Sequence, residues 1–163
     1  MRMPNGSGRC ATRHGSGSYG TVKSSNHTDI VLAGGTYYLD QLQTSGNSNI
    51  VLTAGANTTL YIKSDLDLSG GTIINPNRDP TTLQVYYSGT TDAKLTGGGD
   101  FYGTVYAPNA TLKLAGQSNF YGSFIANQIF VTGGAAVHFD AGLLQDFLTQ
   151  RTYAIISWTQ KTF

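Results

Sequence analysis

The feature that most constrains this chain is a segment that repeats itself. Residues 95–103, LTGGGDFYG, recur as LAGQSNFYG at residues 114–122, and a weaker third copy, VTGGAAV, begins at Val131. A fixed period of this kind marks a fold in which each unit buries its apolar face against its neighbours. The repeat therefore predicts an architecture of stacked coils, each of roughly 17–20 residues.

Weaker signs of the same repeat occur upstream. Residues 32–38 (LAGGTYY) and 68–74 (LSGGTII) share a glycine-centred pattern, with LTAG at residues 52–55 between them. Short apolar or alternating runs separated by Gly, Asn, Asp and Ser are typical of strands joined by tight turns. We therefore predict an all-β fold, a single β-solenoid and most simply a right-handed β-helix. It would have about six coils of roughly 17–20 residues between Ile30 and Phe139.

Three segments are expected along the chain. Residues 1–27 are rich in Gly and Ser and are predicted to be a flexible leader, with Tyr19 and Val22 as potential anchors of a first strand. Residues 28–140 are predicted to form the solenoid, with residues 75–80 (NPNRDP) as a protruding loop.

The third predicted segment, residues 141–163, is a C-terminal cap. Asp140 can cap a helix over residues 141–150, whose leucines and phenylalanine fall on one side, and residues 153–158 (YAIISW) resemble a final strand. We expect this segment to cover one end of the solenoid, because a bare end exposes unpaired strand edges.

Composition excludes several classes of protein. Charged residues make up 12% of the chain, the net charge is +1 and there is no Glu, so clustered Lys and Arg for nucleic acid or an anionic membrane are lacking. Cys10 is the single cysteine, so no disulfide can form within one chain. No apolar run approaches the ~18 residues that a membrane helix needs, so we expect no membrane insertion by this chain.

The main enzymatic alternative is a polysaccharide lyase or hydrolase. Such chemistry requires two or more carboxylates, or a calcium-binding Asp cluster with a basic residue. Asp65, Asp67 and Asp79, with Arg78, form the one local gathering of suitable residues. Asp65 and Asp67 alternate within a strand-like stretch and should share a face. Turn and surface Asp residues in a chain without Glu explain this gathering more simply, so no catalytic residue is predicted.

His138 and Asp140 form an H-x-D pair on one strand face, a spacing compatible with a metal site or an acid/base pair. The third repeat places His138 where Tyr102 and Tyr121 stand in the earlier copies. We therefore interpret His138 as a substituted position of a stacked row, and we predict neither a metal nor a cofactor.

The ten tyrosines are the best candidates for a binding surface. Tyr102 and Tyr121 are in register one coil apart and, with Tyr106, are predicted to belong to an aromatic stripe. Other tyrosines nearby could join the same stripe, namely Tyr37, Tyr38, Tyr86 and Tyr87. Such a stripe can stack on sugar rings or on a partner protein. The alternative is that the tyrosines stack on one another and only hold the coils together.

Several motifs carry a family resemblance over residues 28–158. They are GGTYY (34–38), YYSG (86–89), the tandem FYGTVYAPNA (101–110) and FYGSFIANQI (120–129), VHFD (137–140) and a closing ISW. With these motifs the chain resembles the β-helical C-terminal region of bacterial type IV pilus-assembly proteins, which are associated with minor pilins. That region is related in repeat style to adhesin-like surface domains.

The resemblance implies a scaffold or adhesion role on a bacterial surface and carries over no catalytic residue. We expect a non-catalytic structural or adhesive module of a cell-surface or pilus-associated protein, extracellular and exported through a segment absent from this chain. Other surface or pilus proteins, or glycans, would be its partners, and the chain would be a monomer or weak oligomer. The alternatives are a glycan-binding or polysaccharide-degrading β-helix enzyme and a self-polymerising solenoid filament.

Overall fold

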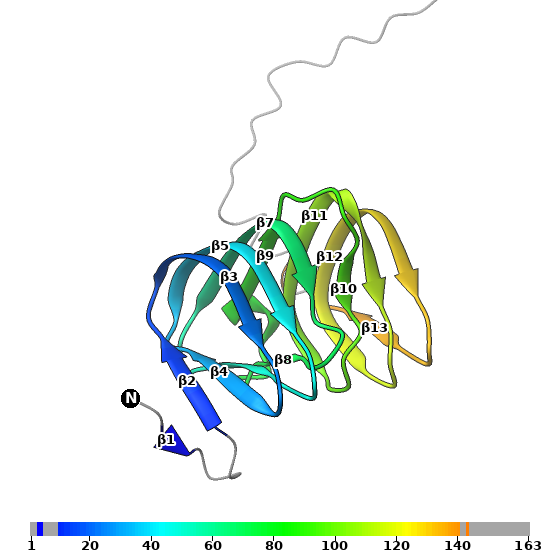
Figure 1. The fold of residues 1–163 in the computed structure, drawn as a ribbon. Coiled ribbons are helices and arrows are strands. Elements are labelled where there is room, and N and C mark those ends of the chain that lie inside the picture. Colours follow the sequence, from blue (N-terminus) through cyan, green and yellow to red (C-terminus); the bar gives the residue numbers. More distant parts are fainter. Residues whose placement is uncertain (1–2, 5–9, 141–142, 144–163) are drawn as a thin grey trace, which may run out of the picture.

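The chain winds into stacked coils whose strands run parallel to one another (Figure 1). The computed structural model describes residues 3–4, 10–140 and 143. It shows an all-β solenoid of about six turns, as the internal repeat predicts. Nearly all of the strand pairs are parallel; the exception in the described part of the chain is β1 (Met3–Pro4), which pairs antiparallel with β2.

The coils have three faces, and strands of successive coils pair along each face. The first face is formed by β2 (Cys10–His14), β4 (Thr28–Leu32), β6 (Ile50–Leu52), β8 (Ile73–Ile74), the first residues of β11 and β12, and β13 (Ala136–Phe139). The Asn75 amide joins β8 to β11 on this face, because its Nδ2 donates to the Tyr102 carbonyl at 3.1 Å.

Longer strands cross the second face and bend onto the third. These are β3 (Gly17–Ser24), β5 (Gly35–Thr44) and β7 (Thr58–Asp67), followed in the fourth coil by the separate strands β9 (Leu83–Tyr87) and β10 (Ala93–Leu95). Strands β11 (Phe101–Leu114) and β12 (Asn119–Val131) each pass over all three faces. Register shifts at Leu39/Gln41 and Ala107/Thr111 mark the corner between the second and third faces.

Alternate residues of each strand point into the solenoid. In β7, for example, Leu60, Ile62 and Leu66 are buried, while Tyr61 and Lys63 between them are exposed. This alternation places Leu, Ile, Val, Phe and Tyr side chains from every coil in one continuous core. Burial of this apolar surface is the main favourable contribution to the stability of the fold.

Glycines at one corner allow the coils to approach closely. A Cβ atom on Gly71 would lie 1.6 Å from the Ser48 carbonyl oxygen, and one on Gly97 would lie 1.8 Å from the Gly71 carbonyl oxygen. Both contacts are with backbone atoms, which cannot move aside without breaking the stack. Gly71 and Gly97 are therefore required by space at this corner, where three coils stack directly on one another.

Coil length departs from the prediction in the middle of the solenoid. The pairs Phe101–Phe120 and Gly17–Tyr37 each join residues whose separation along the chain lies within the predicted range. Thr58, in contrast, pairs with Leu83, so the coil between them is clearly longer. The predicted coil length is thus too short here, because corners can lengthen without changing the pairing of the strands they join.

The solenoid also begins earlier than the predicted boundary at residue 28. Residues 10–24 form a complete first coil, since β2 pairs with β4 and β3 pairs with β5. Tyr19 and Val22 pack against the core, as expected for anchors of a first strand. The prediction of a flexible leader through residue 27 is wrong for this part, because parallel pairing with the next coil compensates for its few apolar residues.

Residues 75–80 do not protrude freely as predicted. Asn75 and Pro80 are buried, and the segment leads into a short 3-10 helix, η1 (Pro80–Thr82), capped by Asp79. The Asn75 Nδ2 donates to the Asp79 carbonyl, the Thr82 hydroxyl and the Tyr102 carbonyl. The insertion is therefore tied to the body of the solenoid by one buried amide group.

The predicted helix over 141–150 and strand over 153–158 lie outside the described residues, apart from Leu143. The Leu143 amide donates to the Asp140 carbonyl at 3.2 Å. No helix in the described part of the chain is long and apolar enough to cross a membrane.

Candidate binding face

Four tyrosines form a row along the outside of the second face. Tyr38, Tyr61, Tyr86 and Tyr106 are paired in register on β5, β7, β9 and β11. Their side chains are between 37% and 54% exposed, so each one reaches solvent. We call these four residues the tyrosine row. Parallel pairing fixes their spacing, because equivalent positions of adjacent strands lie one strand apart.

The rings of the tyrosine row contact one another. The centroids of Tyr38 and Tyr61 are 5.1 Å apart and those of Tyr61 and Tyr86 are 4.9 Å apart, with nearly parallel planes in both pairs. Tyr106 is turned edge-on to Tyr86, at 6.2 Å and 62°. Neighbouring rings therefore cover much of each other's faces, and the row presents mainly ring edges and hydroxyl groups to solvent.

A shallow groove of about 390 Å³ runs beside this row. The four tyrosines line it together with polar side chains that include Asp40, Lys63, Ser88 and Asn109. One Lys and one Asp leave the groove near neutrality. Its surface combines apolar ring edges with groups that can both donate and accept hydrogen bonds, which suits a neutral polar ligand that also has apolar patches.

The predicted stripe of Tyr102, Tyr121 and Tyr106 is divided between two faces. Tyr102 and Tyr121 stack at 4.7 Å on the first face, and Tyr121 stacks on His138 at 4.6 Å. Tyr106 belongs instead to the tyrosine row on the second face. Tyr102 and Tyr121 are partly buried, so this second stack offers less of its surface to a ligand than the tyrosine row does.

His138 occupies the position that the repeat predicts, directly beside Tyr121 in the stack. Its Nε2 also lies 3.1 Å from the Asn119 side-chain oxygen. Asn119 in turn donates to Asp100 through both its backbone amide and its Nδ2, at 3.0 Å each. These contacts account for His138 as part of a structural stack, and no group of three potential metal-ligating side chains occurs among the described residues.

Polar side chains also link the coils at the corner that precedes the first face. Asp29 accepts from the Asn49 backbone amide and Nδ2, and the Asn49 side-chain oxygen accepts from the Thr72 amide. Asp100 and Asn119 repeat this arrangement further along the solenoid. The carboxylates and amides at these positions thus satisfy backbone groups where the chain turns, which is a structural role.

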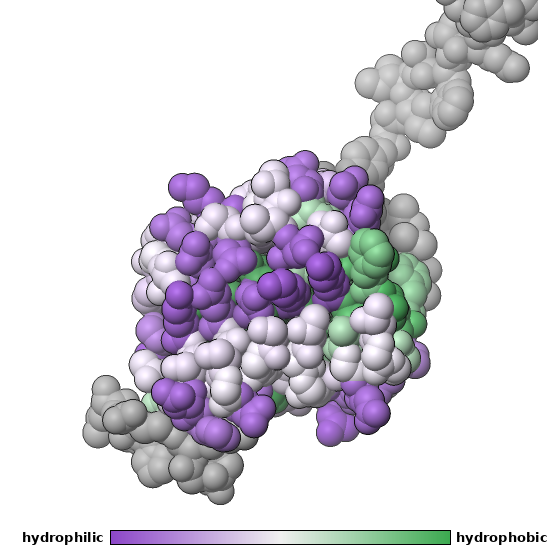
Figure 2. Space-filling model, turned by 45° about the vertical axis from the view of Figure 1, so that its right-hand side comes forward, coloured by the Kyte–Doolittle hydropathy of each residue, from purple (hydrophilic) through white to green (hydrophobic). Residues whose placement is uncertain are grey.

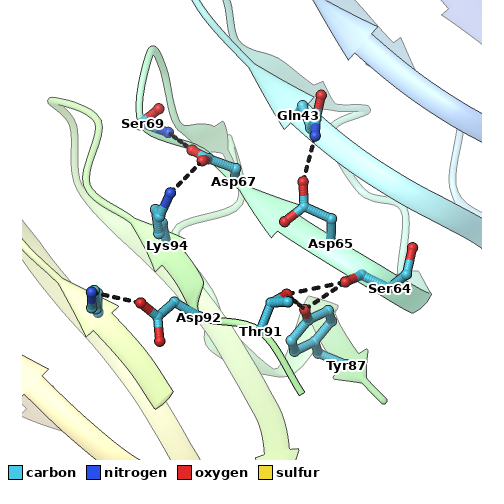
Figure 3. A network of polar contacts seen from close by, with 10 residues as sticks. Gln43, Ser64, Asp65, Asp67, Ser69, Tyr87, Thr91, Asp92 and Lys94 are labelled. Atoms are coloured by element: carbon cyan, nitrogen blue, oxygen red, sulfur yellow. Dashed lines mark hydrogen bonds and ion pairs between the residues drawn. The ribbon is translucent and has the colours of Figure 1, made fainter. Parts of the chain in front are cut away.

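The carboxylates considered for catalysis are already partnered, as Figure 3 shows for Asp65 and Asp67. Asp65 and Asp67 share the outward side of β7, as predicted from their alternation. Asp65 accepts from the Gln43 side chain, and Asp67 accepts from Lys94 Nζ at 2.9 Å. Asp79 and Arg78 lie elsewhere, in the turn between the first and second faces, where Asp79 caps η1 through Thr81.

The pKa of Asp67 further limits its chemistry. Partial burial raises the pKa of this carboxyl, but hydrogen bonds from Lys94 and Ser69 outweigh that effect and hold the pKa below its ordinary value. A general acid in a glycosidase needs a raised pKa so that it remains protonated near neutrality. Asp67 is instead ionised at neutral pH and serves as one half of an ion pair.

Other tyrosines belong to the core. Tyr37 and Tyr87 are 1% exposed, and burial raises the pKa of both hydroxyls. Tyr87 donates to the Ser64 carbonyl at 2.9 Å, and Tyr37 donates to the His14 carbonyl at 3.0 Å. In YYL (37–39) and VYY (85–87) the inward and outward tyrosines are therefore sequence neighbours with different roles.

Sequence reasoning did not single out Tyr61 for the binding surface. A signal was present, since YYL (37–39), LYI (60–62), VYY (85–87) and VYA (105–107) each place a tyrosine between two inward-facing residues. Searching for this alternation in place of a fixed period would have found the tyrosine row, because the separation between its members changes from coil to coil.

Fold and site together define a parallel β-solenoid with a tyrosine-lined groove on one outer face. The family model described as "Domain of unknown function (DUF7305)" matches residues 40–145, and the chain belongs to this family. The matched residues run from within β5 to beyond β13 and include Tyr61, Tyr86 and Tyr106. No curated protein and no solved structure matches the chain.

Proposed function

We propose that this chain is a non-catalytic adhesive module of a bacterial cell-surface or pilus-associated protein, and that the tyrosine row is its contact surface. The ligand class that suits the groove best is a neutral glycan chain lying across β5, β7, β9 and β11.

The observation that carries this proposal is the exposed, in-register placement of Tyr38, Tyr61, Tyr86 and Tyr106 beside a near-neutral groove. Hydroxyl groups at regular intervals can exchange hydrogen bonds with sugar hydroxyls, and the ring edges between them can contact the apolar C–H surfaces of a sugar. The row is held rigid by ring stacking and strand pairing, so little conformational entropy would be lost when a ligand binds.

Two considerations favour adhesion over catalysis. The candidate carboxylates are engaged in structural contacts, and none of the three lines the groove. The resemblance to the β-helical region of type IV pilus-assembly proteins supports an exported surface location.

The test is a binding screen of the folded chain against an array of glycans and extracellular-matrix proteins. A Tyr61→Ala/Tyr86→Ala variant should lose binding, because it removes two central members of the tyrosine row. A Tyr102→Ala/Tyr121→Ala variant is the matched control, since it also removes a stacked tyrosine pair but from the first face. Both variants are checked for unchanged strand content by circular dichroism.

The outcomes of this screen separate the competing functions. Loss of glycan binding in the first variant alone supports the proposal, whereas equal loss in both variants contradicts the assignment to the groove. Absence of any binding by the intact chain would indicate a scaffold whose tyrosines only hold the coils together. Release of reducing sugar from a polysaccharide, abolished by Asp67→Asn, would instead support the enzymatic alternative.

A further inference from the structure

The last coil exposes large apolar side chains at one end of the solenoid. Figure 2 shows green, apolar residues gathered at this end, whereas the centre of the same view is polar. The exposed side chains on β12 and β13 are Ile125, Ile129, Phe130, Val131, Val137 and Phe139, with exposures from 44% to 62%. We call them the apolar end. A contiguous exposed patch of this kind marks a surface that something covers.

Part of the strand edge at this end also lacks a paired strand among the described residues. β13 pairs with residues Asn119–Gly122 of β12, on the first face. Residues 123–131 of β12, on the second and third faces, have β11 on one side and no paired strand on the other within the described part of the chain. An open parallel edge beside apolar side chains is suited to accept a further strand.

The first coil does not show the same combination. None of the large exposed hydrophobic side chains in the described residues lies on β2 or β3, and β1 pairs antiparallel with β2. The apolar end is therefore a local property of the last coil and does not simply result from stopping a solenoid.

We propose that residues 141–163 form a further turn of the solenoid that covers the apolar end and pairs with the free edge of β12. This segment follows directly from β13, at the same end of the molecule. Residues 141–163 outnumber the residues that separate Phe101 from Phe120 along the chain, so they are long enough for one coil.

The composition of residues 141–163 fits this role. It contains closely spaced apolar residues that could face the end of the core, namely Leu143, Leu144, Phe147, Leu148, Ile155, Ile156 and Trp158. A tethered segment is also favoured over a second copy of the chain, because its effective concentration at the adjoining end is high and does not depend on the amount of protein.

Trp158 offers a direct test, since it is the single tryptophan of the chain. The measurement is its fluorescence emission and its quenching by acrylamide in the intact, folded chain, at several protein concentrations. We expect emission at shorter wavelength than in concentrated urea and at least a threefold reduction in quenching, both independent of protein concentration. Phe139→Ser, at a position 62% exposed, should shift the emission towards the unfolded value.

Tyr38→Ser is the matched control, because Tyr38 is similarly exposed at 54% but belongs to the tyrosine row. It should leave Trp158 emission unchanged. Emission and quenching equal to those in urea, in a chain that circular dichroism shows to be folded, would overturn the proposal. Protection that appears only as dimers form would also overturn it, by assigning the apolar end to a second copy. The outcome is independent of whether the tyrosine row binds glycans.

Discussion

Two parts of the solenoid bury their apolar side chains in the same core, but successive strands repeat regularly in one part and irregularly in the other. From β11 to β12 the chain repeats almost residue for residue, with Phe101, Tyr102 and Gly103 opposite Phe120, Tyr121 and Gly122. From β7 to β9 the corresponding step contains an insertion, η1 and a longer corner. Both steps nevertheless place alternate apolar residues in one core.

The difference between these two parts shows that strand register is constrained in a coil, whereas the length of its corners can vary. Strand register along a face is preserved in both parts, because a shift of one residue would turn every inward side chain outward. Corner length is free to vary, provided that the buried backbone groups of the longer corner find partners. Asn75 supplies those partners in the β7 to β9 step, whereas the β11 to β12 step needs no equivalent.

The largest effect is expected in the core, on both sides of this comparison. Leu60 in β7 and Leu112 in β11 are both fully buried, at 0% exposure. Leu60→Ala and Leu112→Ala should each lower the free energy of unfolding by about 2–5 kcal/mol, since each removes buried contacts and leaves a cavity. Urea denaturation measures both. A much smaller loss for Leu60 would mean that the irregular part is loosely packed.

The next largest effect is expected at the corner where the glycines stack. Gly97→Ala should lower the free energy of unfolding by about 3 kcal/mol, because the new Cβ would collide with the Gly71 carbonyl. Gly98→Ala is the matched control, as a Cβ there meets nothing within 4 Å. It should change stability by less than about 1 kcal/mol. Equal losses at the two positions would contradict the close approach of coils at Gly97.

A smaller effect is expected at the amide that holds the insertion. Asn75→Ala should lower the free energy of unfolding by about 2 kcal/mol, because it leaves the partly buried carbonyl oxygens that the Asn75 amide serves without their donor. Asn75→Asp should cost more, since a carboxylate would face those oxygens in place of an NH₂ group. Thermal unfolding compares the two variants. If Asn75→Asp were as stable as the unmodified chain, the role assigned to the amide would be wrong.

The smallest effect is expected at the ion pairs of the third face. Lys94→Met removes the partner of Asp67 and should cost about 0.5 kcal/mol, as for other partly exposed pairs. The folded-state pKa of Asp67 is lowered, so its ionised carboxylate contributes to folding stability. That contribution is fully present above the ordinary pKa of 3.8 and is lost as pH falls through the folded-state pKa. The stabilities of the two chains should therefore converge at acidic pH.

The matched control for that pH dependence is Lys113→Met, which removes the 2.6 Å pair between Lys113 and Asp92 beside the regular part of the solenoid. Lys113→Met should lower the free energy of unfolding by no more than Lys94→Met does, because the side chains of Lys113 and Asp92 are both more than 40% exposed. A difference between Lys94→Met and the unmodified chain that stayed constant into strong acid would indicate lost packing of the lysine stem and not lost charge pairing.

The sequence was sufficient to predict a parallel solenoid of about six coils, because FYG at 101–103 and at 120–122 repeats in strict register. It did not reveal the first coil, whose pairing with β4 and β5 depends on backbone hydrogen bonds and leaves little apolar pattern. The candidate binding face was partly missed for a related reason. Tyr61 and Tyr106 become neighbours of Tyr86 through corners of unequal length, which a constant period cannot align.

The tyrosine row has a defined length. The position before Tyr38 is occupied by Ser18, and the position after Tyr106 is occupied by Ile125, so the row ends after four members. Three strand spacings of ~4.8 Å give it a span of about 14 Å. The number of coils that carry an outward tyrosine would therefore act as a molecular ruler for the proposed ligand. A chain-like ligand would engage a fixed number of its units here, and a longer one would extend past the row without meeting another tyrosine.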